Sequence, residues 1–243
     1  MTRSRTAPDA VSARGLVAAH PLDDVVWNAL TTRHREFSEG DDRARRYLAD
    51  VAPFAALRDF SAASVASLLP LASRGHPVAM FTTEPLPSFE QVEVLLAKPL
   101  HQMVAARVAP PLQPRATERL DDSSVADMVA LVERSQPGPF AAHTNRLGDY
   151  LGIRTGGQLV AMTGERMKID GFTEISAVCT HPEHRGHGYA HDLVSLVAQA
   201  LLDRGEQPFL HVFGDNLPAI TLYERLGFTI RRTLQVTILA AKS

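Results

Sequence analysis

The sequence predicts an α+β protein in which a mixed, mostly antiparallel central sheet is flanked by helices. Short apolar runs separated by glycine-containing turns indicate strands in the C-terminal half, and apolar residues at helical spacing surround them. Three prolines between residues 110 and 114 mark a linker, because proline is excluded from helix interiors and central strands. We therefore expect an N-terminal α/β domain over residues 1–112 and a second domain over residues 113–243.

The second domain is predicted to begin with a short strand over 115–120 and a helix. Asp121 to Ser124 offer N-caps for that helix, and its apolar stripe runs from Val125 to Val132. Pro137-Gly-Pro139 ends it.

Three strands are then predicted as an antiparallel meander over 150–154, 158–167 and 172–180. Thr155-Gly-Gly157 turns the first strand into the second. Asp170-Gly171 is a strong hairpin signal between the second and the third.

Two helices and three strands complete the predicted order β-α-β-β-β-α-β-α-β-β. The first helix has an apolar face from Leu193 to Leu201, and Gly205 ends it. A strand over 209–213 follows, and then a helix that Asn216 caps and Gly227 stops. The last two strands are predicted over 228–231 and 234–240.

The N-terminal half lacks a local pattern that we can connect to chemistry. Helices are predicted over 25–32, 43–48, 62–69 and 89–96, and strands over 77–83 and 102–108.

Composition limits the class of protein. The net charge of −2 gives no basic excess of the kind that nucleic-acid binding needs, so we expect no nucleic-acid partner. No apolar run approaches the roughly 18–20 residues that span a bilayer, and the patch at 16–19 is too short for a signal peptide. The single cysteine, Cys179, fits a reducing compartment. We expect a cytoplasmic protein without a membrane partner.

The most unusual segment is His181 to Ala190, HPEHRGHGYA, which joins a predicted strand to a predicted helix. It is open to interpretation as a metal site, a phosphate-binding loop or a plain loop. Unpaired N–H groups at a helix N-terminus attract anions, and Gly186 and Gly188 let a ligand approach the backbone. Arg185 adds a fixed charge. These features favour an anion site, most simply one for phosphate or pyrophosphate.

The histidines of this segment leave a metal-dependent hydrolase as an alternative. A zinc site needs three or four converging ligands, whereas His184 and His187 would lie on different sides of a loop that wraps a phosphate. We therefore expect solvent-facing loop histidines and no metal. Cys179 as a nucleophile is a further alternative, although free cysteines are usually small buried residues.

Arg185-Gly-His-Gly188-Tyr-Ala190 matches Gln/Arg-x-x-Gly-x-Gly/Ala, and so resembles the coenzyme A loop of the GNAT superfamily of N-acetyltransferases. The segment from Val178 to His184 is similar to the family's V-x-T-x-P-x-x-R-G approach. Asn216 to Phe228 is similar to its N-x-x-A-x-x-L-Y-x-x-x-G-F segment. The resemblance covers residues 115–243 and implies the GNAT fold there. The N-terminal half is then interpretable as a degenerate second copy of that fold.

The resemblance also implies roles for particular residues. The loop that binds the coenzyme A pyrophosphate through its backbone amides corresponds to Arg185, Gly186, His187, Gly188, Tyr189 and Ala190. The splayed strand that pairs with the pantetheine arm corresponds to Ala177, Val178 and Cys179. Asn216 corresponds to a residue that contacts the cofactor, and Tyr223 to the one that protonates the departing thiolate.

The implied reaction is transfer of an acetyl group from acetyl-CoA to a primary amine by direct attack in a ternary complex. A tyrosine with a pKa near about 10 is protonated at neutral pH, as a proton donor must be. An alkylammonium is only about 0.1% neutral at pH 7, so a general base is useful. Glu174 is the candidate base and Glu165 the second choice. The acceptor, a small-molecule or peptide amine, is not identified, and neither is the oligomeric state. The alternative is a coenzyme A-binding module without turnover.

Overall fold

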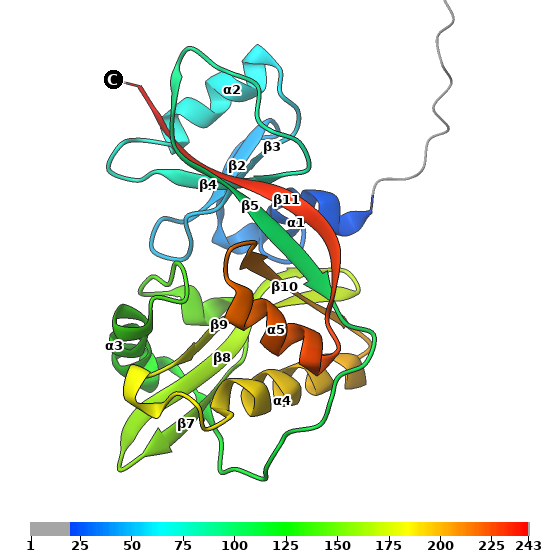
Figure 1. Cartoon of the computed structure of the whole chain (residues 1–243). Helices are drawn as coiled ribbons and strands as arrows, with labels where there is room; N and C mark the ends of the chain where they lie inside the picture. The colour runs from blue at the N-terminus through cyan, green and yellow to red at the C-terminus, as the bar shows by residue number, and fades with distance from the viewer. Residues whose placement is uncertain (1–19, 243) are drawn as a thin grey trace, which may run out of the picture.

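An eight-stranded sheet runs through the protein and joins its two lobes, as the computed structural model of residues 20–242 shows (Figure 1). The strand order is β4-β11-β5-β10-β9-β8-β7-β6, and every neighbouring pair is antiparallel except β9 with β10. The strands are β4 (Val78–Thr82), β5 (Val92–Val104), β6 (Glu118–Leu120), β7 (Tyr150–Thr155), β8 (Gln158–Ile169), β9 (Phe172–Thr180), β10 (Gln207–Phe213) and β11 (Thr229–Ala241). The predicted fold class is confirmed.

The helices pack around this sheet, and a second, three-stranded sheet lies in the upper lobe (Figure 1). The helices are α1 (Val25–Thr31), α2 (Ala62–Leu68), α3 (Val125–Ser135), α4 (Tyr189–Asp203) and α5 (Leu217–Leu226), and the small sheet has β1 (Ser38–Gly40), β2 (Ala44–Tyr47) and β3 (Ala55–Leu57). A short 3-10 helix, η1 (Pro21–Asp24), precedes α1.

The two faces of the large sheet support different cores because side chains alternate along each strand. On β10, Phe209 packs into the core shared with the upper lobe, which includes Tyr47 and Phe54. Its neighbours Leu210 and Val212 face the opposite way and pack against α4 and α5. The central strands are therefore held from both sides, which fixes the position of the loop between β9 and α4.

The elements predicted for the second half are present, with shifted ends. The meander forms β7, β8 and β9, and the turn at Gly171 has a positive φ of 78°. Asn216 caps α5 by accepting the N–H of Ala219 at 3.3 Å, and Gly227 stops α5 in a left-handed conformation. The two predicted closing strands are one strand, β11, with a register shift between Ile230 and Arg232.

Two helix predictions in the N-terminal half are wrong. Residues 43–48 contribute β2, and residues 89–96 contribute the start of β5. The second segment has apolar residues at both helical and alternating spacing. The segment forms a strand because β5 pairs with β11 from Val92 to Val104. The hydrogen bonds of this long strand pair outweigh the weak local preference for a helix.

The large sheet crosses the predicted domain boundary. β5 precedes residue 112 but lies between β10 and β11, which both follow it. β4 closes the same edge by pairing with β11. The division at residue 112 stays a prediction, as does the origin of the first half in a second copy of the fold.

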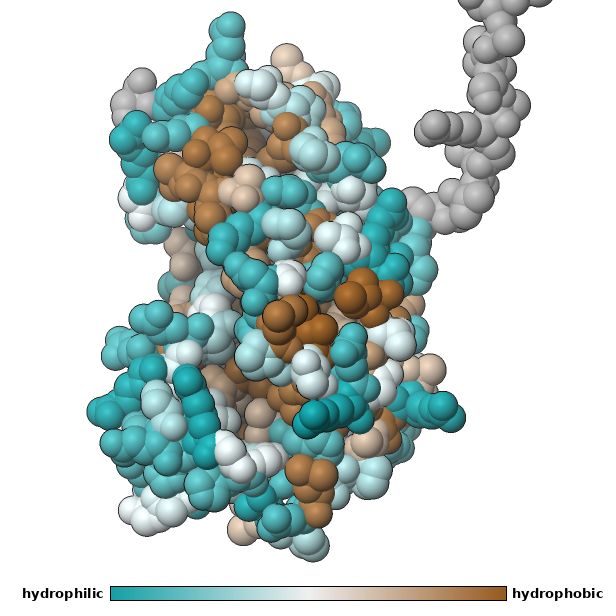
Figure 2. Space-filling model, viewed as in Figure 1, coloured by the Kyte–Doolittle hydropathy of each residue, from teal (hydrophilic) through white to brown (hydrophobic). Residues whose placement is uncertain are grey.

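The space-filling view shows two lobes with a narrower waist on one side and apolar side chains on the upper lobe and near α5 (Figure 2). Exposed large apolar side chains include Val94 and Leu95 of β5 and Leu217 of α5. Among the described residues, no helix is long and apolar enough to cross a membrane. The predicted absence of a signal peptide concerns residues 1–19, which lie outside the described range.

Candidate active site

The parallel pair β9 and β10 separates part-way along its length. The two strands pair only from Phe172 to Glu174 on β9 and from Gln207 to Phe209 on β10. β9 continues to Thr180, and its residues 176–178 are half-buried although the strand is central in the sheet. The backbone of β9 beyond Glu174 therefore has no strand partner on the β10 side, and an extended ligand can pair with it there.

A bulge bends β9 at this opening. Ala177 has a positive φ of 52°, and the register with β8 shifts between the pairs Met162–Cys179 and Gly164–Ser176. An alanine in the left-handed region costs roughly 1–2 kcal/mol, so the surrounding structure must impose the conformation. Ala177 and Cys179 pack on the α3 side, whereas Val178 packs on the α4 and α5 side.

The loop between β9 and α4 presents backbone N–H groups that the described chain does not use. Gly186 and Gly188 have φ angles of 81° and 79°, and Gly188 immediately precedes α4. Within residues 20–242, no hydrogen-bond acceptor is found for the N–H groups of Gly186, His187, Gly188, Tyr189 and Ala190. We call these N–H groups the loop amides. The dipole of the 15-residue helix α4 adds partial positive charge beside them. The N–H of Arg185, expected to join the loop amides, donates instead to the carbonyl of Pro182 at 3.4 Å.

Tyr223 lies on α5 and faces the opened part of β9. Its ring packs in one core with Ile175 and Val178 of β9. Burial raises the pKa of the Tyr223 hydroxyl, and the nearby Cys179 thiol raises it further, so the group stays protonated at neutral pH. The hydroxyl bonds to no other described residue and is not sealed from solvent. It is therefore free to donate a proton to a ligand in the opening.

Glu174 marks the point where β9 and β10 separate, but its carboxylate is fully occupied. Arg166 donates to both oxygens, at 2.7 and 2.6 Å, and His211 Nδ1 lies 2.7 Å from Oε1. Burial raises the pKa of Glu174, but the charge and hydrogen bonds of Arg166 outweigh it and bring the pKa to about 2. A carboxylate this acidic is a weak base, so the geometry argues against Glu174 as the group that accepts the amine proton.

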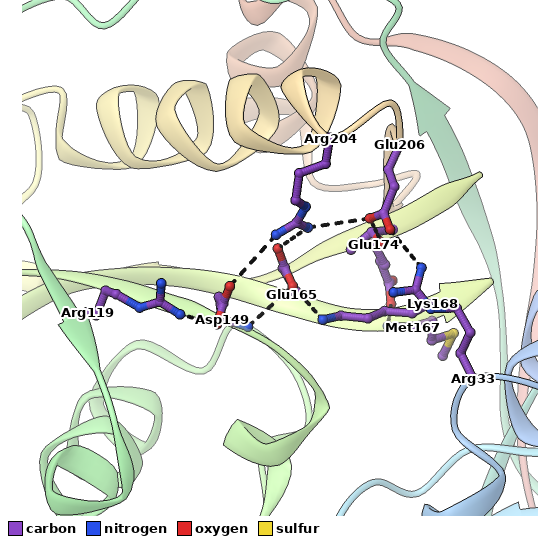
Figure 3. Close-up of polar contacts among 10 residues, drawn as sticks. Arg33, Arg119, Asp149, Glu165, Met167, Lys168, Glu174, Arg204 and Glu206 are labelled. Carbon is purple, nitrogen blue, oxygen red and sulfur yellow. Dashed lines mark hydrogen bonds and ion pairs between the residues drawn. The ribbon is translucent and has the colours of Figure 1, made fainter. Parts of the chain in front are cut away.

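Glu165, the second candidate base, lies in a separate ion-pair network (Figure 3). Its carboxylate is 2.6 Å from Arg204 and 2.7 Å from Lys168. Arg204 also contacts Asp149 and Glu206, and Glu206 pairs with Arg33 of the upper lobe at 2.7 Å. Glu165 is 2% exposed. Both carboxylates are thus built into the fold.

The loop histidines do not all face solvent as expected, because His181 is 6% exposed and its ring centroid lies 5.6 Å from that of His184. His181 accepts the N–H of Glu183, His187 stacks on Tyr189 with 5.5 Å between ring centroids, and His191 lies 3.6 Å from Asp192. Across residues 20–242, no three His, Cys, Asp or Glu side chains are placed to hold a metal ion. The metal-free site stays a prediction. Burial raises the pKa of Cys179 to about 12, which disfavours a nucleophilic thiolate.

Two hollows lie away from the loop amides and Tyr223, and the first of them borders Asp149 of the Glu165 network. One, of about 460 Å³, is bounded by residues 119–123 and 145–150. The other, of about 150 Å³, lies in the upper lobe beside Trp27, Phe60 and Phe81. Neither contains a residue predicted for the site.

Some residues at the site escaped prediction because their contacts are distant in sequence. Arg166 and His211 surround Glu174 from β8 and β10. Arg115, just after the prolines, contacts α4 through Asp192 and the loop before α4 through the carbonyl of His187. Strand alternation could have placed Arg166 and Glu174 near each other across the hairpin, but no local signal connects residues 115 and 192.

Known proteins share this architecture. A family model described as FR47-like protein matches residues 150–236. The crystal structure of a putative acetyltransferase from the GNAT family of Novosphingobium aromaticivorans is 36% identical and superimposes with a TM-score of 0.85, covering 93% of this chain and 100% of that one. This chain belongs to the GNAT family. A GCN5-related N-acetyltransferase from Kribbella flavida, 15% identical with a TM-score of 0.64, covers 93% of this chain and 97% of its own and shares the fold.

Two curated relatives match a shorter segment. An uncharacterized N-acetyltransferase of Bacillus subtilis, YobR, is 34% identical over 62 residues, which are 25% of each chain. The mycothiol acetyltransferase of Corynebacterium jeikeium is 38% identical over 61 residues, 25% of this chain and 18% of that protein. The matches thus span a quarter or less of those relatives.

Proposed function

We propose that this GNAT protein is an N-acetyltransferase that moves an acetyl group from acetyl-CoA to a primary amine. The observation that carries the proposal is the set of loop amides without partners between the opened strand β9 and the N-terminus of α4. A diphosphate needs several converging N–H donors and a positive field, and this joint offers both.

The residues divide into binding and chemical roles. The loop from Arg185 to Ala190 holds the diphosphate of coenzyme A. The free edge of β9 from Ala177 to Cys179 pairs with the pantetheine arm. Asn216, exposed at the start of α5, contacts the cofactor in addition to capping its helix.

The chemistry requires one bond to form and one to break. The amine nitrogen attacks the thioester carbon, the carbon–sulfur bond breaks, and the sulfur takes the proton of Tyr223, which then regains a proton from solvent. The amine gives up its own proton to solvent, because Glu174 and Glu165 are held in ion pairs. We assign Glu174 a positioning role: it holds Arg166 and His211 where β9 and β10 separate.

The ion pairs of Glu174 and Glu165 leave neither carboxylate free to act as a base. They therefore also favour a second candidate function, a coenzyme A-binding module without turnover. The two functions differ in whether free thiol appears. A small-molecule or peptide amine is the acceptor class that the first function requires.

A binding and turnover experiment separates these functions. Acetyl-CoA at 100 times its Kd stabilises a protein that binds it by about 2.7 kcal/mol, which a melting curve detects. Thiol release is then measured over a panel of amino acids, peptides, polyamines and drug-like amines. Stabilisation with release supports the transferase, and stabilisation without any release supports the binding module. No stabilisation at millimolar acetyl-CoA would contradict both.

A further inference from the structure

The segment between β5 and β6 runs along the helices that frame the coenzyme A loop (Figure 1). The N–H of Ala109 donates to the carbonyl of Leu226 at the end of α5, at 3.0 Å. The hydroxyl of Ser195 on α4 donates to the carbonyl of Ala109 at 2.6 Å. The N–H of Leu112 donates to Asp192 Oδ1, also at 2.6 Å. The predicted linker is thus fixed against the start of α4.

Arg115, at the end of this segment, makes three contacts with the loop and the first turn of α4. Its Nε donates to Asp192 Oδ2 at 2.5 Å. Its Nη2 donates to the carbonyl oxygen of His187. Its guanidinium carbon lies 4.6 Å from the centre of the Tyr189 ring, which is a cation–π distance. The side chain is 18% exposed.

The contact with His187 determines where a loop amide points. The peptide group is planar and trans, so the carbonyl of His187 and the N–H of Gly188 point in opposite directions. By holding that carbonyl on one side, Arg115 directs the Gly188 N–H to the other. A side chain at Gly188 would meet Leu112 at 3.1 Å, so the same segment also restricts the loop sterically.

The contact of Arg115 with Asp192 affects the charge beside the loop amides. The Asp192 side chain is 1% exposed and lies in the first turn of α4, directly after the loop amides. Burial raises the pKa of Asp192, but the hydrogen bonds from Arg115 and Leu112 outweigh it and lower the pKa, so the group is an anion. An unpaired carboxylate here would repel a diphosphate. Arg115 neutralises it.

We propose that Arg115 is a positioning residue for diphosphate binding, which it supports by neutralising Asp192 and by orienting the His187–Gly188 peptide. The inference rests on the proposed function, since it concerns the same coenzyme A site. It predicts that the segment between β5 and β6 contributes to cofactor affinity without itself joining the reaction.

The test is calorimetric titration of coenzyme A into full-length variants. Arg115→Met keeps the length of the side chain and removes its charge and donors, and it should raise the Kd by roughly 10- to 100-fold. The KM for acetyl-CoA should rise in parallel, while kcat at saturating acetyl-CoA changes little. Arg115→Met/Asp192→Asn removes the unpaired charge as well, so it should recover at least half of the lost affinity on a logarithmic scale.

Arg154→Met is the matched control. Arg154 also pairs with two carboxylates, those of Glu118 and Asp127, and is 26% exposed, but it lies on β7. Its removal should leave the Kd unchanged. Arg115→Lys covers the case in which Arg115→Met does not fold: it keeps the charge beside Asp192 but cannot bridge Asp192 and His187 together. It should give an intermediate loss.

The outcomes separate this inference from the proposed function. If the natural protein does not bind coenzyme A, the proposed function fails. If it binds and folded Arg115→Met or Arg115→Lys binds equally well, only the role of Arg115 is overturned. A double variant as weak as Arg115→Met would overturn the neutralisation of Asp192.

Discussion

Replacing Glu174 with glutamine separates a positioning role from a general-base role. The carboxylate is 0% exposed, bonds to both Arg166 and His211, and accepts the N–H of Met167 at 3.3 Å. Glutamine keeps the shape but removes the charge. Arg166, whose side chain is 9% exposed, then remains as a buried cation without its partner.

The expected loss of stability follows from two independent magnitudes. Removing one partner of a buried ion pair costs about 3–5 kcal/mol. A carboxyl whose pKa falls from 4.5 to about 2 on folding contributes about 3 kcal/mol at neutral pH. At roughly 2–4 °C per kcal/mol for a protein of this size, Glu174→Gln should lower the Tm by roughly 10 °C.

The sign of the pH dependence follows from the lowered pKa of Glu174. The stabilisation is fully present above the unfolded-state pKa of about 4.5 and is lost as the pH falls toward 2. Urea unfolding followed by circular dichroism should therefore show a large difference between the natural protein and Glu174→Gln at pH 7. That difference should shrink as the pH falls from 4.5 toward 2, and it should vanish near pH 2, where the carboxyl of the folded natural protein also becomes protonated.

Glu118→Gln is the control for this substitution. Glu118 pairs with Arg154 at 2.5 Å but its side chain is 45% exposed, so the change should cost less than about 1 kcal/mol. Suppose instead that Glu174→Gln were as stable as the natural protein, and that its acetyl-transfer rate no longer fell at low pH. Glu174 would then be the base, and our reasoning would be refuted.

Substitutions at three further positions test individual features. Tyr223→Phe should lower kcat roughly 10²-fold with little change in the Kd for acetyl-CoA, and an unchanged kcat in a thiol-release assay would remove Tyr223 from the chemistry. Ala177→Gly should stabilise the protein or leave it unchanged in thermal melts because glycine accepts its φ of 52°, whereas Ala177→Val should destabilise it. Gly164→Ala should lower the Tm sharply, because the added Cβ would clash with the Tyr150 ring. A Tm within about 1–2 °C of the natural value, which is the effect of an ordinary surface substitution, would contradict that packing.

Local patterns predict the second half of the fold well. Asn216 and Gly227 delimit α5 through capping chemistry that depends only on neighbouring residues, and Gly171 turns the hairpin for the same reason. The glycine loop before α4 is recognisable because its glycines lie close together in sequence, between a strand and a helix. Such features are encoded within a few residues of each other.

The features that escaped prediction depend on contacts between distant segments. β5 forms a strand because β11 and β10 flank it, although its first residues also fit a helix. Glu174 resembles a candidate base in sequence, and only its contacts with Arg166 and His211 show a buried ion pair. The contact between Arg115 and Asp192 joins residues on either side of four strands and a helix.

The most direct test of the proposed coenzyme A site is the response of the loop amides themselves. Backbone ¹H–¹⁵N signals of residues 186–190 are followed while coenzyme A, or pantetheine as a ligand without diphosphate, is added. We predict that coenzyme A shifts these signals with saturation at one equivalent and that pantetheine leaves them nearly unchanged. Binding of coenzyme A with unmoved signals at residues 186–190, or equal shifts with pantetheine, would contradict the assignment of these amides to the diphosphate.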